Sequence, residues 1–194
     1  SNEFSLKEAL NTRALWILSI GTAVLYLFHS GINSHQASFL QERGISLGLS
    51  SVVISINAIS TGLGSVCWGY ICDKFSIRFA FSSVFICTLF ALLGLIYTHD
   101  INMAIFSSIL FGSAMGGMLT VPSVAYANFY GTNSIGRIRG FANPMSTIGS
   151  ASGVMISGVI FDIFNSYVLA FWFFFAVSIV MLIISLFLRN PNNN

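Results

Sequence analysis

The stretch GYICDKFSIR, residues 69–78, is a short charged segment between two long apolar runs. In it a glycine precedes a carboxylate by four residues, and two cations follow. Gly69 allows another backbone to approach closely, and Asp73 can accept hydrogen bonds from a helix N-terminus or pair with an arginine. Lys74 and Arg78 would remain in water beside anionic head groups. By itself the segment predicts a plain cytoplasmic turn between two membrane helices.

The composition of the chain indicates a membrane protein. Of its 194 residues, 55% are hydrophobic and 7% are charged, whereas a soluble domain carries about 25% charged residues. The net charge of +2 is small, and no basic patch indicates a nucleic-acid partner. Cys67, Cys72 and Cys87 lack the spacing of metal ligands, so we expect them to be reduced packing residues. We predict no metal site and no cofactor.

Six apolar runs are long enough to cross a bilayer, which takes about 20 residues in a helix. None of them contains Asp, Glu, Lys or Arg, apart from Arg78 at the edge of the third run. We therefore predict an all-α membrane protein with six transmembrane helices. Gly31 and Pro122 are the expected bend points of the two longest runs. The runs are 14–40, 48–71, 78–98, 101–129, 140–161 and 165–188.

The distribution of the cations predicts the orientation. Six spans place both termini on one side, and that side holds seven of the eight cations. Because lysine and arginine gather on the cytoplasmic side, both termini are expected to be cytoplasmic. Only Arg43 lies on the other side, together with Glu42, Asp100 and Asp162. The expected location is the bacterial cytoplasmic (plasma) membrane, with lipid as a surrounding partner.

Two short matches predict an internal repeat. The segment 37–40 recurs ninety residues later at 127–130, and the segment 69–75 recurs eighty-nine residues later at 158–164. Each repeat holds three spans, an odd number, so the second copy must be inverted. Inverted three-helix repeats are a frequent plan of transporters, with binding sites at the repeat interface.

The chain is predicted to divide into three parts. Residues 1–13 form a cytoplasmic linker, in which Ser5-Leu6-Lys7-Glu8 is typical of a capping box. Residues 14–188 form the six-helix bundle, with a first triplet over 14–98 and an inverted triplet over 101–188. Residues 189–194 form a cytoplasmic tail.

The charged segment resembles the loop signature of the major facilitator superfamily, G-x-x-x-D-[RK]-x-G-x-[RK]. Gly69, Asp73, Lys74 and Arg78 match it, whereas Ser76 stands where the second glycine is usual. The resemblance implies a cytoplasmic latch in which Asp73 is the acceptor and Gly69 gives close contact. The two cations would hold the cytoplasmic interface.

Other stretches resemble the carboxyl-terminal half of such a transporter, nearest to the oxalate/formate antiporter-like and monocarboxylate transporter-like branches. Residues 5–16 are similar to the linker before the seventh helix and to its entry. Residues 31–35 and 39–45 are similar to the outer end of that helix, and residues 129–131 and 136–140 to the loop before the eleventh. Ser65 stands where those branches often have an arginine that holds a carboxylate, so an anionic substrate is not carried over. Gly153-Val154 also replaces a frequent Gly-Pro, which puts a kink there in question.

The superfamily has twelve spans, and this chain has six. The resemblance therefore implies a partner, which is an amino-terminal six-helix half on the same or a separate chain, or a second copy. The fold implied is half of a major facilitator fold.

Polar side chains inside a membrane span usually face another helix or a water-filled cavity. The first, second, fourth and fifth runs carry such residues at helical spacing, whereas the third and sixth suit lipid-facing support. The resemblance assigns the same four helices to the substrate cavity. The candidate cavity residues are His29, Asn33, Gln36, Asn57, Thr61, Ser65, Thr120, Asn143 and Ser146.

Each candidate also has a packing interpretation. Small residues at every third or fourth position are typical of close helix packing. Asn33, Asn57 and Asn143 would either line a cavity or form interhelical hydrogen bonds. His29 would either pack as a neutral ring or act as the one mid-span group that titrates near neutral pH. No carboxylate lies within a span, so we expect no Asp/Glu proton relay in these six helices.

Together these patterns predict the carboxyl-terminal domain of a secondary active transporter that moves a small polar or organic solute by alternating access. The alternatives are an isolated non-transporting fragment, a homodimeric half-size carrier and a six-span membrane scaffold subunit. An enzyme is not expected, because no acid accompanies the serines and histidines within the spans to orient a catalytic triad.

Overall fold

The computed structural model describes residues 4–193 and is built of helices. Two short helices, α1 (Leu6–Leu10) and α3 (Gln36–Glu42), and the 3-10 turn η1 (Pro191–Asn193) flank or connect the long ones. Within these residues, six helices are long and apolar enough to cross a membrane, which confirms the predicted fold class. They are α2 (Arg13–Asn33), α4 (Leu47–Lys74), α5 (Ile77–Ile96), α6 (Ile101–Tyr130), α7 (Ile135–Phe164) and α8 (Val168–Ser185).

Polar side chains mark where four of the long helices begin. Thr12, Ser46, Ser76 and Asp100 each accept a hydrogen bond from the backbone N–H three residues further on. Such a cap satisfies one of the N–H groups that the first helical turn leaves unpaired. The predicted capping box of α1 is also present, with both of its reciprocal hydrogen bonds.

The first apolar run forms two helices rather than one. α2 ends at Asn33 and α3 begins at Gln36, so the break lies at Ser34 and His35 instead of the predicted bend at Gly31. Gly31 lies inside α2, where an added Cβ would lie 2.7 Å from the backbone oxygen of Gly153. This glycine therefore serves close packing against α7.

The segment 69–78 is mostly helical, which corrects the expectation of a turn over this whole stretch. α4 continues to Lys74 and α5 begins at Ile77, so only Phe75 and Ser76 lie between them. Lys74 in the last turn of α4 is favourable there, because the C-terminal end of a helix carries a partial negative charge.

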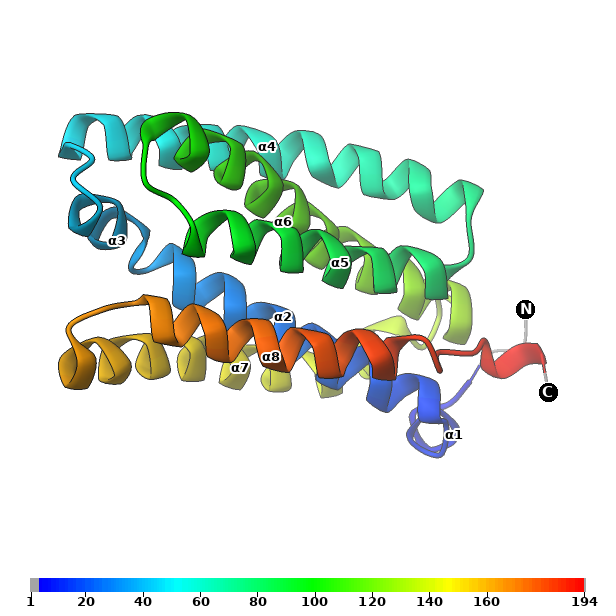
Figure 1. Ribbon diagram of the computed structural model, residues 1–194. Coiled ribbons are helices and arrows are strands. Elements are labelled where there is room, and N and C mark those ends of the chain that lie inside the picture. Colours follow the sequence, from blue (N-terminus) through cyan, green and yellow to red (C-terminus); the bar gives the residue numbers. More distant parts are fainter. Residues whose placement is uncertain (1–3, 194) are drawn as a thin grey trace.

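The six long helices run back and forth along one axis (Figure 1). α1 and the last turn of α8 lie at one end of the bundle, called here the basal end, and α3 lies at the opposite, outer end. Each helix of the triplet α6, α7 and α8 runs opposite to its counterpart in α2, α4 and α5 (Figure 1). The two triplets are therefore inverted relative to each other, as predicted.

Glycines bring one helix of each triplet into close contact with a helix of the other. A Cβ on Gly153 of α7 would strike the backbone oxygen of Leu27 in α2. In α4 a Cβ on Gly64 would lie 2.8 Å from the Cα of Ser113 in α6. Without a hydrophobic drive between helices in lipid, such close contacts hold a membrane bundle together.

These contacts repeat at the spacing that the sequence predicted. A Cβ on Gly116 would lie 2.8 Å from the backbone of Gly64, just as a Cβ on Gly153 would meet Leu27. Gly64 lies eighty-nine positions before Gly153, and Leu27 lies eighty-nine positions before Gly116. A second pair of contacts shows the same offset. A Cβ on Gly149 would meet the backbone of Ala23, and a Cβ on Gly112 would lie 2.8 Å from the Cβ of Ser60. Ala23 lies eighty-nine positions before Gly112, and Ser60 lies eighty-nine before Gly149. The seams α2–α7 and α4–α6 are thus equivalent, which confirms the two inverted three-helix repeats.

Candidate functional site

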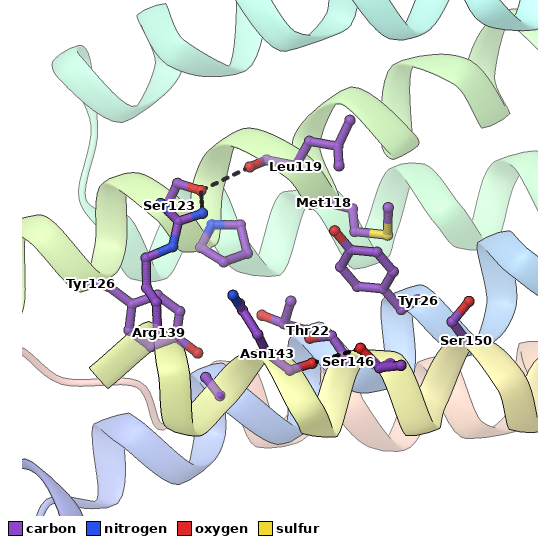
Figure 2. Close-up of a pocket in the computed structure, with 13 residues that line it drawn as sticks. Thr22, Tyr26, Met118, Leu119, Ser123, Tyr126, Arg139, Asn143, Ser146 and Ser150 are labelled. Atoms are coloured by element: carbon purple, nitrogen blue, oxygen red, sulfur yellow. Dashed lines mark hydrogen bonds between the residues drawn. The ribbon is translucent and has the colours of Figure 1, made fainter. Parts of the chain in front are cut away.

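A cavity of about 450 Å³ lies between α2, α6 and α7 in the basal half of the bundle, and we call it the inner cavity (Figure 2). Its lining is mainly uncharged and polar, and Arg139 is the one charged residue in it. The lining residues are Thr22, Tyr26, Met118, Leu119, Pro122, Ser123, Tyr126, Arg139, Ala142, Asn143, Ser146, Thr147 and Ser150.

Hydrogen bonds fix several of these side chains in the cavity wall. Arg139 Nη2 donates to Ser123 Oγ at 3.3 Å, and Ser123 Oγ donates to the backbone oxygen of Leu119 at 3.1 Å (Figure 2). The hydroxyls of Tyr126 and Ser19 are hydrogen-bonded, 3.0 Å apart. The guanidinium is therefore held at the wall and leaves most of its N–H donors available to a ligand.

Two further polar groups of the inner cavity project into its space. The Tyr26 hydroxyl and the Asn143 amide lie among the lining residues in Figure 2. Within residues 4–193, neither side chain has a hydrogen-bond partner, and Asn143 is exposed. A hydroxyl and an amide can each both donate and accept, so these groups suit a solute with mixed polar groups.

A second cavity, of about 510 Å³, lies between α2, α4 and α6 in the outer half, and we call it the outer cavity. Three of its lining residues, Asn33, Asn57 and Thr61, were predicted from the sequence. Ser34, Ile54, Ala58 and Met115 complete the lining.

An amide cluster forms one wall of the outer cavity. Asn57 Nδ2 lies 3.1 Å from Asn33 Oδ1 and 3.2 Å from Gln36 Oε1, and it donates to both. Gln36 Nε2 donates to Ser108 Oγ of α6 at 3.0 Å. Asn57 is 3% exposed, and its Oδ1 has no partner among the described residues. Asn57 therefore bonds between helices and also borders a cavity, so both of its predicted interpretations apply.

The two cavities occupy equivalent places in the two repeats. Four residues of the outer cavity correspond to residues of the inner cavity that lie eighty-nine positions later. The pairs are Ile54 with Asn143, Asn57 with Ser146, Ala58 with Thr147, and Thr61 with Ser150. In the same way Ser34 corresponds to Ser123, and Tyr26 corresponds to Met115. Each triplet thus contributes one cavity with polar side chains in its lining, and the two cavities lie in opposite halves of the bundle.

Four of the predicted cavity residues line neither cavity. One is Gln36, which bonds to Asn57 behind the lining of the outer cavity, and the others are His29, Ser65 and Thr120. His29 is 1% exposed and stacks on Phe111, with ring centroids 4.7 Å apart. Its Nδ1 lies 2.9 Å from the backbone oxygen of Leu25. Thr120 Oγ1 donates to the backbone oxygen of Ser65 at 3.4 Å, within the α4–α6 seam. These contacts favour the packing interpretation for His29, Ser65 and Thr120.

The predicted latch residues lie on the surface of the basal end. Asp73, Lys74 and Arg78 are exposed, and the Lys74 ammonium lies 5.6 Å from the ring centroid of Tyr70. In the part of the chain that the structure describes, Asp73 forms no ion pair. An added Cβ on Gly69 would meet only Thr120 Cγ2, at 4.0 Å, so nothing within this bundle requires a glycine there.

Sequence reasoning missed the tyrosines and the arginine of the inner cavity. Tyr26 and Tyr126 count as apolar residues within their runs, and Arg139 counted only as a marker of the cytoplasmic side. The repeat offset was the available signal, because it carries Met115 and Ser34 of the outer cavity onto Tyr26 and Ser123 of the inner one.

A comparison with known protein families matches residues 18–194 to the Major Facilitator Superfamily. The matched range contains every residue that lines the two cavities and the whole segment 69–78. No curated protein matches the chain.

Proposed function

Because the chain belongs to the Major Facilitator Superfamily, a family of membrane transporters, we propose that it is the carboxyl-terminal half of a secondary active transporter. The chain is an integral multi-pass membrane protein. Its solute in this proposal is a small polar or organic molecule that moves by alternating access. The observation that carries the proposal is the pair of cavities at equivalent positions in two inverted triplets, each with polar side chains in its lining.

The solute would contact the polar groups of the two cavities. In the inner cavity these are Arg139, Asn143 and Ser146 with Tyr26, and in the outer cavity Asn33, Asn57 and Thr61 backed by Gln36. These groups supply many hydrogen-bond donors and acceptors but only one charge. Such a lining suits a polar molecule that is recognised by its hydroxyl, amide or carbonyl groups.

The proposal includes a companion bundle, because α4 and α7 are the least buried of the long helices. α4 exposes Ile59, Leu63 and Val66 on one side, and Gly62 among them has no atom within 4 Å of an added Cβ. α7 exposes Ile148 and Met155, which lie eighty-nine positions after Ile59 and Val66. Small and apolar residues on an exposed membrane helix suit close packing by another helix.

The companion in this proposal is an amino-terminal six-helix half, on the same or a separate chain, or a second copy. Rocking of the two bundles would open the inner and the outer cavity in turn. The exposed carboxylate of Asp73, which forms no ion pair within residues 4–193, would then act as the latch acceptor on the basal side, with Lys74 and Arg78 beside it. The basal end would be cytoplasmic, in a bacterial plasma membrane, because it carries most of the cations.

One experiment tests the proposal against its alternatives. The chain is purified in detergent, sized, reconstituted in vesicles and tested for saturable uptake of a panel of sugars, amino acids and organic acids. A monomer without uptake is expected, since half of the solute pathway would be missing. A dimer with uptake would indicate a half-size carrier, and a stable dimer without uptake of any solute would contradict the proposal in favour of a scaffold subunit.

A further inference from the structure

A third cavity, of about 600 Å³, lies at the basal end and plays no part in the proposed solute pathway. It lies between the start of α5, the end of α6 and the chain that follows α8, and we call it the basal cavity. Arg78 and Arg189 both line it, and none of the described lining residues carries a carboxylate. A neighbouring cavity of about 580 Å³ shares Arg189 and adds Arg13.

The positive charge of the basal cavity is not balanced by an ion pair among the residues that the structure describes. Arg78 and Arg189 are exposed, and neither forms an ion pair within residues 4–193. α5 begins at the same place, with Ser76 and Ile77 in the lining. The N-terminal end of a helix of this length adds a partial positive charge and favours an anion.

Arg189 is held at the cavity by the segment that follows α8. Asn192 Nδ2 donates to the backbone oxygen of Phe129 at 2.9 Å, and the Asn192 backbone N–H donates to Asn190 Oδ1 at 2.9 Å. Leu188 on its other side is buried. The backbone that carries Arg189 is therefore held between the ends of α6 and α8.

The surroundings of the basal cavity are those of a membrane surface. Phe75 in its lining and Phe187 in that of the neighbouring cavity are both exposed, and Phe79 packs beside Phe75 with ring centroids 5.1 Å apart. Exposed aromatic side chains beside arginines suit the boundary between acyl chains and head groups. A soluble anion has no acyl chain that could contact this apolar border.

We propose that the basal cavity binds the phosphate of an anionic phospholipid, such as phosphatidylglycerol or cardiolipin, between Arg78 and Arg189. Basic pockets between membrane helices on the cytoplasmic side bind such head groups. Arginine suits the task because its planar donors match a phosphate. The site does not depend on transport; only its assignment to the inner leaflet rests on the proposed orientation.

The test measures lipid binding to the purified chain in detergent by native mass spectrometry, with phosphatidylglycerol, cardiolipin and phosphatidylcholine as probes. Arg78→Gln and Arg189→Gln are each expected to weaken binding of the two anionic lipids about fivefold. Arg137→Gln is the matched control, because Arg137 is exposed at the same end but lines neither the basal cavity nor the neighbouring cavity. Binding by the unaltered chain should also weaken as salt is raised.

Three results would overturn the proposal. An equal loss in Arg137→Gln would mean that only general surface charge attracts the lipid. Equal binding of phosphatidylcholine would remove the anionic preference. Displacement of the lipid by inorganic phosphate would assign the cavity to a soluble anion. If a variant fails to elute as a single species, the salt dependence and lipid preference of the unaltered chain still decide.

Discussion

Asn57 combines a structural role and a proposed binding role in one side chain. Its Nδ2 group is shared between Asn33 and Gln36, while its Oδ1 is buried without a partner among the described residues. An unpaired buried acceptor costs about 1–3 kcal/mol. A solute hydroxyl or N–H group that entered the outer cavity would satisfy this oxygen and recover that cost.

The accessibility of an introduced cysteine should distinguish Asn57 from Asn143. At the repeat offset of eighty-nine, Asn57 corresponds to position 146, three residues from Asn143. In a chain without its native cysteines, Asn143→Cys should react readily with a water-soluble thiosulfonate reagent, because Asn143 is exposed in the inner cavity. Asn57→Cys should react far more slowly, because Asn57 is 3% exposed. The reaction rates are measured by mass spectrometry.

Ser157→Cys provides the unreactive reference for this comparison, since Ser157 is fully buried in α7. A solute of the transporter should protect Asn143→Cys from the reagent. Equal rates at positions 57 and 143 would contradict the difference in burial.

The exposed carboxylate of Asp73 leads to a second prediction at the residue scale. In the complete transporter, Asp73→Asn should lower uptake about tenfold while membrane insertion is unchanged, because a charge-assisted hydrogen bond contributes about 1.5–3 kcal/mol. Radiolabelled uptake and the amount of protein in the membrane are measured together. Asp162→Asn is the control, since Asp162 is the exposed equivalent in the second repeat.

Undiminished uptake by Asp73→Asn would remove the latch role. A similar loss in Asp162→Asn would instead indicate a role of the repeated acidic position that is shared by both ends of the bundle.

At the scale of the helices, two seams, α2–α7 and α4–α6, depend on glycine. Gly153→Ala and Gly64→Ala should each destabilise the bundle by about 1–3 kcal/mol, because their methyl groups would meet backbone atoms of the facing helix. Gly62→Ala should be neutral or stabilising by up to about 1 kcal/mol, since it gains helix propensity and meets no atom within 4 Å. Thermal unfolding in detergent measures all three.

The comparison has a clear negative outcome. If Gly62→Ala lowered the unfolding temperature as much as Gly153→Ala, the close contacts would not be what makes glycine necessary in these helices.

The sequence predicted the spans best where hydropathy and helix length agree. The runs 78–98 and 101–129 correspond to Ile77–Ile96 and Ile101–Tyr130. The fifth run underestimated α7, which begins at Ile135, because the first turns of this helix carry the charged residues Arg137 and Arg139. Hydropathy detects the apolar core of a span but not its polar extensions.

The candidate site was predictable only in part, because the sequence does not specify which helices touch. Polar spacing identified the four helices that line the cavities, including Asn57 and Asn143. It could not divide those residues between an inner and an outer cavity. It also could not show that Ser65 and Thr120 bond within a seam, since that depends on how closely α4 and α6 approach.

At the scale of the whole molecule, the inverted repeat fixes where each connection must lie. The α3–α4 connection lies at the outer end and the α6–α7 connection at the basal end (Figure 1). In a chain without native cysteines, Glu42→Cys should be labelled by an impermeant maleimide in intact cells. Gly136→Cys should be labelled only after the membrane is permeabilised, since it lies on the other side.

Both labelled positions are exposed, so access from water is not limiting. Labelling of the two cysteines from the same side would exclude the six-span arrangement and, with it, the assignment of one cavity to each side of the membrane.

The pairing of helices across the two triplets has a consequence for biosynthesis. α2 leaves the ribosome about a hundred residues before α7, the helix against which its closest glycine contacts are made, and α4 likewise precedes α6. The first three inserted segments therefore have no native seam to close on, and they must stay loosely associated in the bilayer until the later ones arrive. A nascent chain arrested after α5 should accordingly be the stage at which membrane quality-control proteases and insertion chaperones engage it most strongly.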